Sequence, residues 1–411
     1  MPKPDYMRSK ILLILLVIIS SCTEKKEIFT FQIQEGNGFF TNNPVSIDVS
    51  NLGSTDFKLF NNGQPVPFDF DESSNKIWFI HSPDRSGTYT IEAAAESENI
   101  PQELSVVKKD GSLILGKGDT SLVGYRYEMH YPPKGVDSIF KKSGYIHPII
   151  TPKGDTLTRI NPPDHWHHYG VWGPWTHTRI DTMRVDFWNL VEGQGTVLFK
   201  DFNSISKGDV STGFSAAQEH IDFKTQPTPQ VALNEDLQVK LWDLDRDDRY
   251  MLDYTSTFTT PLEKGILFEA YRYGGGLGMR FTERWHKDNC KVLTSEGKDR
   301  LTADGSNAKW AIVSGKSGDG NGTNGILFMS YPENRMHPEP MRVWPIDGNG
   351  GRGDMFFEFC PIRHEEWQIQ PNKEYELKYR MLVFEGELTR EEAEAYWQAF
   401  ANPPKVKPIA N

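Results

Sequence analysis

Cysteine is scarce in this chain of 411 residues, which contains only Cys22, Cys290 and Cys360. The sequence has no CxxC motif and no Cys/His spacing of the zinc-finger kind, which argues against a structural zinc site. Cys290 and Cys360 lie far apart in the sequence. A disulfide between them is possible, but the spacing in the sequence does not establish it.

Long apolar runs are lacking as well. The run Ile11–Ile19 follows Arg8 and Lys10 and is too short to cross a bilayer, but it has the length and the flanks of a signal-peptide core. The residues that follow, Ile19-Ser20-Ser21-Cys22, resemble a bacterial lipobox, in which the cysteine is lipidated and becomes the new N-terminus.

We therefore expect residues 1–21 to be a lipoprotein signal peptide, Cys22 to carry lipid and residues 22–27 to form a tether. The alternative is an ordinary signal peptide with a chance cysteine. The first interpretation predicts an exported lipoprotein, in the periplasm or attached to the outer membrane, that contacts the membrane through its lipid anchor only.

Positive charge is in deficit. Lys and Arg number 45 against 56 Asp and Glu, which gives a formal net charge of −11. Overall repulsion argues against nucleic acid as a partner, whereas a small anionic ligand can still bind through local arginines. Aromatic residues make up 12% of the chain, and exposed rings can stack on sugar faces.

Helical periodicity is nearly absent, whereas short alternating apolar and polar runs separated by turn residues are frequent. Residues 28–106 predict a small, immunoglobulin-like β-sandwich that serves as an accessory domain. Residues 107–404 predict a large antiparallel β-sandwich, supersandwich-like, as the catalytic domain. One helix is expected, beginning after Thr389, because Thr389 and Glu392 form a capping box and Pro403 lies beyond its end.

Histidine is concentrated in one proline-rich stretch of 22 residues, which contains His147, His165, His167 and His168. Imidazole titrates near neutral pH, and prolines stiffen the backbone around it. The stretch is therefore the candidate for proton transfer or for metal binding.

Seven motifs resemble the PmoA-like family of exported Bacteroidetes proteins: SGYIHPIITPKGDTL, PPDHWHHYGVWGPW, VDFWN, YGGGLGMRF, AKWAIVSG, ENRMHPEPMRVW and YRMLVFEGELT. The resemblance covers residues 120–400 and implies glycan catabolism in polysaccharide utilisation. More closely, the chain resembles an oligosaccharide dehydratase of marine ulvan-utilisation loci. That resemblance implies a lyase that removes water from oligosaccharides ending in a 4,5-unsaturated uronic acid.

Such a reaction needs a base, an acid and a group that holds negative charge. We expect His147, His168, His165, His167 and Tyr145 to supply the proton carriers, and Arg280 and Arg342 to bind the substrate's carboxylate. Stacking and further substrate contacts are expected from Trp166, Trp172, Trp310 and His337. In an extended segment His165 and His167 point to one face and His168 to the other, which favours His147 and His168 as the acting pair.

Other interpretations stay open. The chain requires no cofactor by its sequence, but a divalent metal could bind in the His165/His167 region, completed by Asp164 or Glu358. The run Gly274–Gly278 does not precede a helix and does not indicate a nucleotide loop. The alternative functions are a glycoside hydrolase acting on uronyl oligosaccharides and a non-catalytic glycan-binding lipoprotein.

Overall fold

The structure is a computed structural model, and it describes residues 28–34, 36, 40–53, 56–85, 87–93 and 103–409. The expected signal peptide, the lipidation site at Cys22 and the tether lie outside the described residues. Within the described part, no helix is long and apolar enough to cross a membrane. The expected all-β class is confirmed, because the regular structure of the described residues consists of antiparallel sheets apart from one α-helix and three short 3-10 turns.

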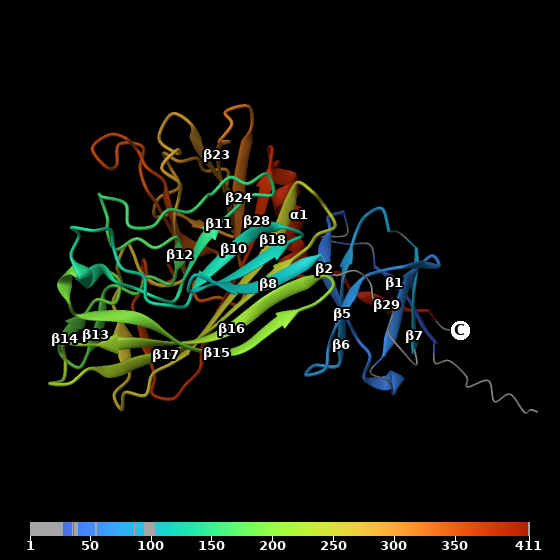
Figure 1. Ribbon diagram of the computed structural model, residues 1–411, viewed down its shortest axis with the longest axis horizontal. Helices are drawn as coiled ribbons and strands as arrows, with labels where there is room; N and C mark the ends of the chain where they lie inside the picture. The colour runs from blue at the N-terminus through green and yellow to red at the C-terminus, as the bar shows by residue number, and fades with distance from the viewer. Residues whose placement is uncertain are drawn as a thin grey trace, which may run out of the picture.

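A small domain of two sheets comes first in the chain. Its sheets have the strand orders β29-β1-β7-β3-β4 and β2-β6-β5, and they enclose their own apolar core. The strands are β1 (Ile28–Ile33), β2 (Asn43–Asp48), β3 (Phe57–Asn61), β4 (Gln64–Pro65), β5 (Phe68–Asp71), β6 (Lys76–His81), β7 (Thr88–Ala93) and β29 (Val406–Pro408). In Figure 1 this domain lies to one side of the larger one, and β29 returns to it from the other end of the sequence.

The large domain is a sandwich of a nine-stranded and an eight-stranded sheet. The nine-stranded sheet runs β22-β25-β26-β20-β12-β11-β10-β9-β8. Its strands are β8 (Leu104–Lys109), β9 (Ser112–Lys117), β10 (Thr120–Arg126), β11 (Tyr145–Ile149), β12 (Val171–Trp172), β20 (Leu277–Arg280), β22 (Asn307–Ala308), β25 (Glu339–Val343) and β26 (Phe356–Phe359). The expected boundary at residue 106 falls inside β8, which pairs with β9, so the chain leaves the small domain before Leu104.

The eight-stranded sheet runs β15-β16-β17-β18-β28-β24-β23-β21. Its strands are β15 (Gly195–Lys207), β16 (Ser211–Asp222), β17 (Gln230–Trp242), β18 (Arg249–Thr259), β21 (Cys290–Thr294), β23 (Trp310–Lys316), β24 (Thr323–Ser330) and β28 (Tyr375–Glu385). A side sheet runs β14-β13-β19-β27 and consists of β13 (Thr178–Ile180), β14 (Met183–Val185), β19 (Ile266–Phe268) and β27 (Trp367–Ile369).

Successive side chains of a strand point to opposite faces of its sheet, so each large sheet has one face toward the core and one outer face. In β18, buried and half-buried side chains alternate from Leu252 on, and the buried Leu252, Tyr254 and Phe258 enter the core between the two large sheets. The opposite face of the eight-stranded sheet packs against α1 (Arg390–Ala401). Thr389 begins this helix with the expected capping box, because its hydroxyl accepts from the backbone N–H of Glu392 while the Glu392 carboxylate accepts from the N–H of Thr389.

Candidate active site

The outer face of the nine-stranded sheet carries the candidate site. On β11, β12 and β26, alternation sends Ile146, Val171 and Phe357 into the core between the large sheets. Their neighbours Tyr145, Trp172 and Phe356 point to the other face, where they join a second buried cluster. The connections 150–170 and 344–355 lie over that face and bring the histidine-rich segment onto it.

The segment after Pro162 is folded into two successive turns. The backbone N–H of His165 donates to the carbonyl of Pro162 at 2.9 Å, and the N–H of His168 donates to the carbonyl of His165 at 3.0 Å. The expected extended conformation, with His165 and His167 on one face and His168 on the other, is therefore wrong. Instead the three rings gather, with centroid distances of 5.5 Å for His165–His167, 4.7 Å for His165–His168 and 4.9 Å for His167–His168.

Asn161 fixes the entry to these turns. Its backbone is left-handed, with φ of 44°, and its side-chain amide donates to the carbonyl of Trp166 at 2.6 Å. Its backbone N–H donates to the carbonyl of His168 at 2.9 Å. Asparagine tolerates the left-handed region better than most residues, which suits it to close this loop.

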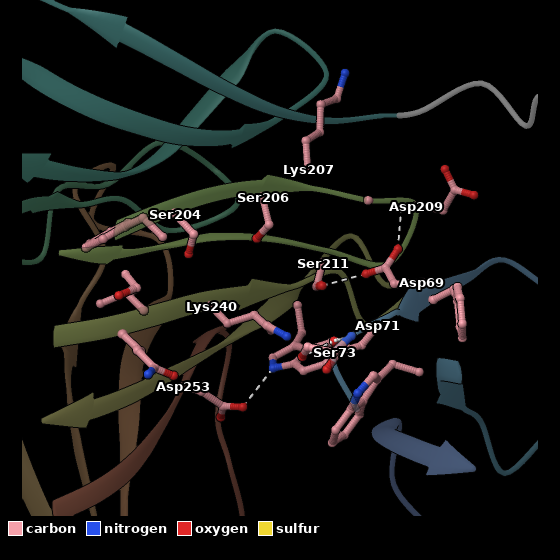
Figure 2. A pocket seen from close by; sticks show the side chains of 18 of the residues that line it. Asp69, Asp71, Ser73, Ser204, Ser206, Lys207, Asp209, Ser211, Lys240 and Asp253 are labelled. Carbon is pink, nitrogen blue, oxygen red and sulfur yellow. Dashed lines mark hydrogen bonds between the residues drawn. The ribbon is translucent and has the colours of Figure 1, made fainter. Parts of the chain in front are cut away.

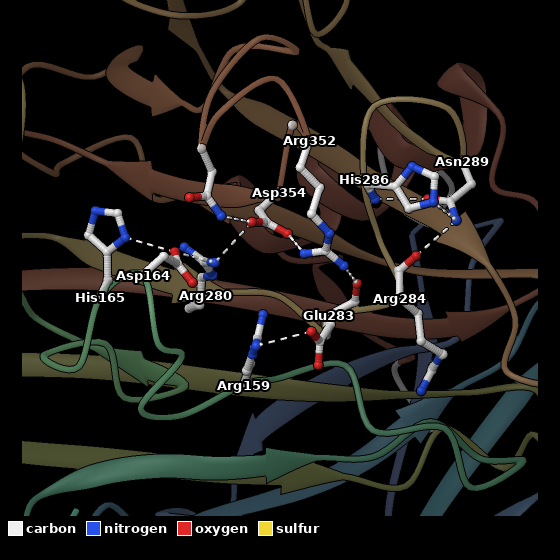
Figure 3. Close-up of polar contacts among 12 residues, drawn as sticks. Arg159, Asp164, His165, Arg280, Glu283, Arg284, His286, Asn289, Arg352 and Asp354 are labelled. Atoms are coloured by element: carbon white, nitrogen blue, oxygen red, sulfur yellow. Dashed lines mark hydrogen bonds and ion pairs between the residues drawn. The ribbon is translucent and has the colours of Figure 1, made fainter. Parts of the chain in front are cut away.

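Asp164 joins a histidine to an arginine. Its Oδ2 atom lies 2.8 Å from Nδ1 of His165 and accepts from Nη2 of Arg280, also at 2.8 Å (Figure 3). Burial alone would raise the pKa of Asp164, but the hydrogen bond with His165 and the charge of Arg280 hold it well below its usual range. The His165 side chain is 34% exposed, so its other ring nitrogen is available to a ligand.

Arg280 is a fully buried cation, with an exposed fraction of 0%. Its Nη2 also lies 3.5 Å from Asp354, and the guanidinium stacks on Trp344 with its central carbon 4.6 Å from the ring centroid. Asp354 in turn is paired with Arg352, as Figure 3 shows. Nε and Nη1 of Arg280 have no hydrogen-bond partner within the described structure, so the guanidinium keeps unused donors. Because no part of its side chain is exposed, Arg280 does not contact a substrate carboxylate directly, which corrects the expectation from the sequence.

An aromatic wall surrounds the histidines. His168 is buried, with its ring 5.5 Å from those of Trp172 and Trp188 and 5.6 Å from that of Trp344. Burial, and then the charge of His167, lower the pKa of His168 well below its ordinary value. Burial, followed by the nearby His165, lowers the pKa of His167 to about 4. Both rings are therefore neutral at pH 7.

His147 and Tyr145 form a neighbouring cluster. Nδ1 of His147 lies 2.8 Å from the hydroxyl of Thr158, and burial, together with His130, lowers the pKa of His147 to about 4. The Tyr145 ring packs 5.0 Å from that of Tyr169, and burial raises the pKa of Tyr145. This cluster is continuous with the histidine turns through Gly170, where an added Cβ would lie 3.0 Å from Cβ of His147 and 2.2 Å from the carbonyl oxygen of Ile146.

The remaining expected residues divide into two groups. Arg342 lies at the border of the site, because its Nη2 donates to the Tyr273 hydroxyl at 3.0 Å and the same hydroxyl accepts from Nε1 of Trp344 at 3.1 Å. Its Nη1 is paired with Asp304 at 2.8 Å. Trp172 belongs to the aromatic wall, and Trp166 is partly buried against the same cluster.

Trp310 and His337 lie elsewhere. Trp310 is 0% exposed and donates to Glu394 of α1 at 2.8 Å, so it is core and cannot be the stacking platform expected from the sequence. His337 stacks on Trp397 of the same helix at 5.9 Å. Its place beside α1 corrects the expectation that it contacts substrate together with Arg280.

Four residues of the site were not among the expected ones. Trp188 and Trp344 both occur in the family-like motifs VDFWN and MRVW, which is the signal that could have found them. Tyr273 precedes the glycine run. Asp354 carries no local signal, because only the fold brings its loop to Arg280.

The sequence left open a divalent metal in the His165/His167 region. Among the described residues, no group of three or more His, Cys, Asp or Glu side chains is arranged to hold an ion. Asp164 is engaged by Arg280, and burial raises the pKa of Glu358 well above its usual value, which makes it a poor ligand. Cys290 and Cys360 are both buried free thiols, so the optional disulfide between them is not formed.

A model of the family described as "Family of unknown function (DUF6807)" matches residues 113–398. No curated protein sequence matches the chain. Among solved structures, heparan sulfate lyase HepC from Pedobacter heparinus is 8% identical with a TM-score of 0.36, over 72% of this chain and 38% of the lyase. A galactose mutarotase related enzyme from Lactobacillus acidophilus is 10% identical with a TM-score of 0.30, over 69% of this chain and 100% of that one. Similarity this distant carries no argument about activity.

Proposed function

The chain belongs to DUF6807, a family of unknown function, and from the site we propose that it is a hydro-lyase that removes water from oligosaccharides ending in a 4,5-unsaturated uronic acid. One observation carries the proposal: a partly exposed histidine and a buried arginine with unused donors share one aspartate oxygen. The resemblance of the surrounding motifs to ulvan oligosaccharide dehydratases supports the substrate class.

The base in this proposal is His165. Asp164 accepts from Nδ1 of His165, which fixes the ring and leaves the other nitrogen, Nε2, with the lone pair that accepts a proton from carbon. The electrons of the broken C–H bond form the new C=C bond, and the C–O bond breaks with its electron pair on oxygen. The proton held on His165 passes to the departing hydroxyl, which leaves as water, and the enzyme returns to its starting state.

Arg280 has the role of holding charge. Its guanidinium lies on the far side of Asp164 from His165, in a buried setting where charges act strongly. It keeps Asp164 ionised, and through Asp164 it positions His165, so it acts on the substrate without contacting it. The neighbouring Trp344 and Trp188 give the sugar ring an apolar boundary and exclude water.

The experiment is mass spectrometry of unsaturated uronyl oligosaccharides before and after incubation with the protein. The expected product is lighter than the substrate by one water molecule, and His165→Ala should abolish it. His286→Ala is a matched control, because its side chain is 35% exposed and lies 3.6 Å from Asp288, but its aspartate does not pair with a buried arginine. Full activity of His165→Ala, or no dehydrated product at any pH, would contradict the proposal.

The same spectra separate the alternatives. A glycoside hydrolase would give shorter oligosaccharides, and a non-catalytic binding protein would leave the substrate unchanged. Repeating the incubation with a chelator tests the metal, since loss of turnover would show that one is required.

We also propose that the protein is an exported lipoprotein anchored through Cys22. The lipobox-like residues ahead of Cys22 support this. Cells expressing the full chain should incorporate labelled palmitate into it, and Cys22→Ala should remove the label. An unlabelled wild-type protein would indicate an ordinary signal peptide.

A further inference from the structure

A long groove lies between the small domain and the large sandwich, far from the histidine site. Its cavity volume is about 900 Å³. The outer face of β15, β16, β17 and β18 forms its floor, and β5 and β6 of the small domain form a wall (Figure 2). Volumes of this size are typical of ligand sites.

The groove and the candidate active site lie on opposite outer faces of the sandwich. The histidine turns cover the nine-stranded sheet, whereas the groove lies on the eight-stranded sheet. A sugar ring bound in the groove therefore cannot contact His165 at the same time.

The wall is fixed to the floor by Asp69. Its Oδ1 accepts from the backbone N–H groups of Asp209 at 2.6 Å and Val210 at 3.1 Å, and its Oδ2 accepts from the Ser211 hydroxyl at 2.5 Å. Figure 2 shows Asp69 between Asp209 and Ser211 at one end of the groove. The groove is thus held open by specific hydrogen bonds between the domains, which favours a preformed site.

Hydroxyl groups form a large part of the polar lining. They come from Ser73, Ser204, Ser206, Ser211, Ser215 and Thr255. Ser73, Ser211 and Ser215 donate to Asp71, Asp69 and Asp236, so their oxygens remain as acceptors for sugar hydroxyls. Ser204, Ser206 and Thr255 add further hydroxyls, a group that can both donate and accept, as a sugar hydroxyl does. Ser204 and Ser206 are exposed positions two residues apart on β15, which places them on one face.

An aromatic platform adjoins the hydroxyls. Trp78 on β6 is half-buried, and its ring lies 5.5 Å from that of the buried Trp242. The ammonium of Lys240 lies 5.0 Å from the Trp242 ring and 5.8 Å from the Trp78 ring. A rigid, partly exposed tryptophan beside hydroxyls and an ammonium offers an apolar face and polar contacts together, which is what a pyranose ring requires.

The charge of the lining selects the class of sugar. The groove is lined by Asp69, Asp71, Glu72, Asp209 and Asp253 on the acidic side, against Lys207 and Lys240. Asp253 is paired with Arg380 and Asp209 also has a partner, but Asp69, Asp71 and Glu72 still outnumber the two lysines. Repulsion would oppose a uronate or sulfate here, whereas an uncharged sugar is unaffected.

We propose that this interdomain groove is a second glycan site that binds a neutral oligosaccharide. This inference stands on the groove alone and does not depend on the reaction proposed for His165.

The test is isothermal titration of the full chain with three neutral hexasaccharides: xylohexaose, cellohexaose and laminarihexaose. At least one should bind, and the Kd should change little between about 0.1 and 0.5 M NaCl, because an uncharged ligand has no charge for salt to screen. Trp78→Ala should weaken binding by roughly tenfold or more.

Because Trp78→Ala also alters packing, Ser206→Arg is the second variant. Position 206 is exposed, so a long side chain there should fill the groove without disturbing the core, and binding should fall similarly. Ser121→Arg, at an exposed position on β10 of the other large sheet, should bind as the wild type does. The proposal is overturned if no neutral hexasaccharide binds, if both groove variants bind normally, or if hexagalacturonate binds in the groove in their place.

Discussion

The imidazole of His165 and the guanidinium of Arg280 meet at a single oxygen of Asp164, each at 2.8 Å. Asp164 therefore cannot change its charge without affecting both neighbours. A base on one side and a cation on the other side of one carboxylate form a coupled unit, and each member can be tested separately.

Replacing Asp164 by asparagine should impair the orientation of the His165 ring, because the carboxylate that accepts from Nδ1 is lost. We expect kcat for dehydration to fall by between about 10² and 10⁴, the usual contribution of a positioned acid or base, with a smaller change in KM. The measurement is steady-state kinetics on protein whose circular dichroism matches the wild type. If Asp164→Asn has the kcat of the wild type, His165 is not the base.

Arg280→Lys should lower kcat/KM by about a hundredfold, since an ammonium keeps the charge but loses the planar set of donors. Arg380→Lys is the matched control. Arg380 is also largely buried and paired with an aspartate, Asp253, but it lies on the other large sheet. If the two variants lose activity equally, the effect is one of stability rather than of the site.

Acidification should reveal the buried, neutral His147. Its pKa is about 4 in the folded chain and near the ordinary value of about 6.5 in the unfolded chain, so the unfolded state binds more protons between these values. Stability should therefore fall as pH drops from about 6.5 to about 4. His147→Gln retains a partner for Thr158 but does not titrate.

The corresponding measurement is urea unfolding at pH 7 and at pH 4.5. The wild type should lose between about 1 and 3 kcal/mol more than His147→Gln on acidification. Equal losses would show that His147 is protonated in the folded protein without cost.

Glu339 should produce the opposite trend. It is buried between the large sheets, accepts from Tyr379 at 2.7 Å and from Ser330 at 2.8 Å, and burial raises its pKa to about 7. The folded state then binds more protons than the unfolded state between about pH 4.5 and 7, so stability should fall as pH rises through that window.

Glu339→Gln has no proton to release, and its stability should be nearly flat there. Relative to wild type, the variant should gain on the order of 3 kcal/mol on going from pH 4.5 to pH 8, measured by urea unfolding. The same difference at both pH values would mean that Glu339 ionises freely in the fold.

Elements with a clear period were predictable from the sequence. The alternation of buried and half-buried side chains from Leu252 on marks β18 (Arg249–Thr259) as a strand, and the capping box placed α1 correctly. By contrast, the second half of β15 (Gly195–Lys207) was not predictable. Its last residues are largely exposed, so no apolar alternation marks them.

The site was less predictable, because its geometry depends on turns and on distant loops. Pro162 and Asn161 turn the histidine segment, which cancels the alternation that an extended chain would have shown. Asp354 reaches Arg280 from 74 positions further along the sequence, and nothing in its local sequence indicates that contact.

The pairing of β1 with β29 has a consequence for synthesis. The small domain begins the described chain, yet one edge of its five-stranded sheet is supplied by Val406–Pro408. During translation this domain would leave the ribosome first and be completed last, after the whole sandwich has emerged. Until then its β1 edge is unpaired, so the growing chain carries an open template for strand addition for most of its synthesis.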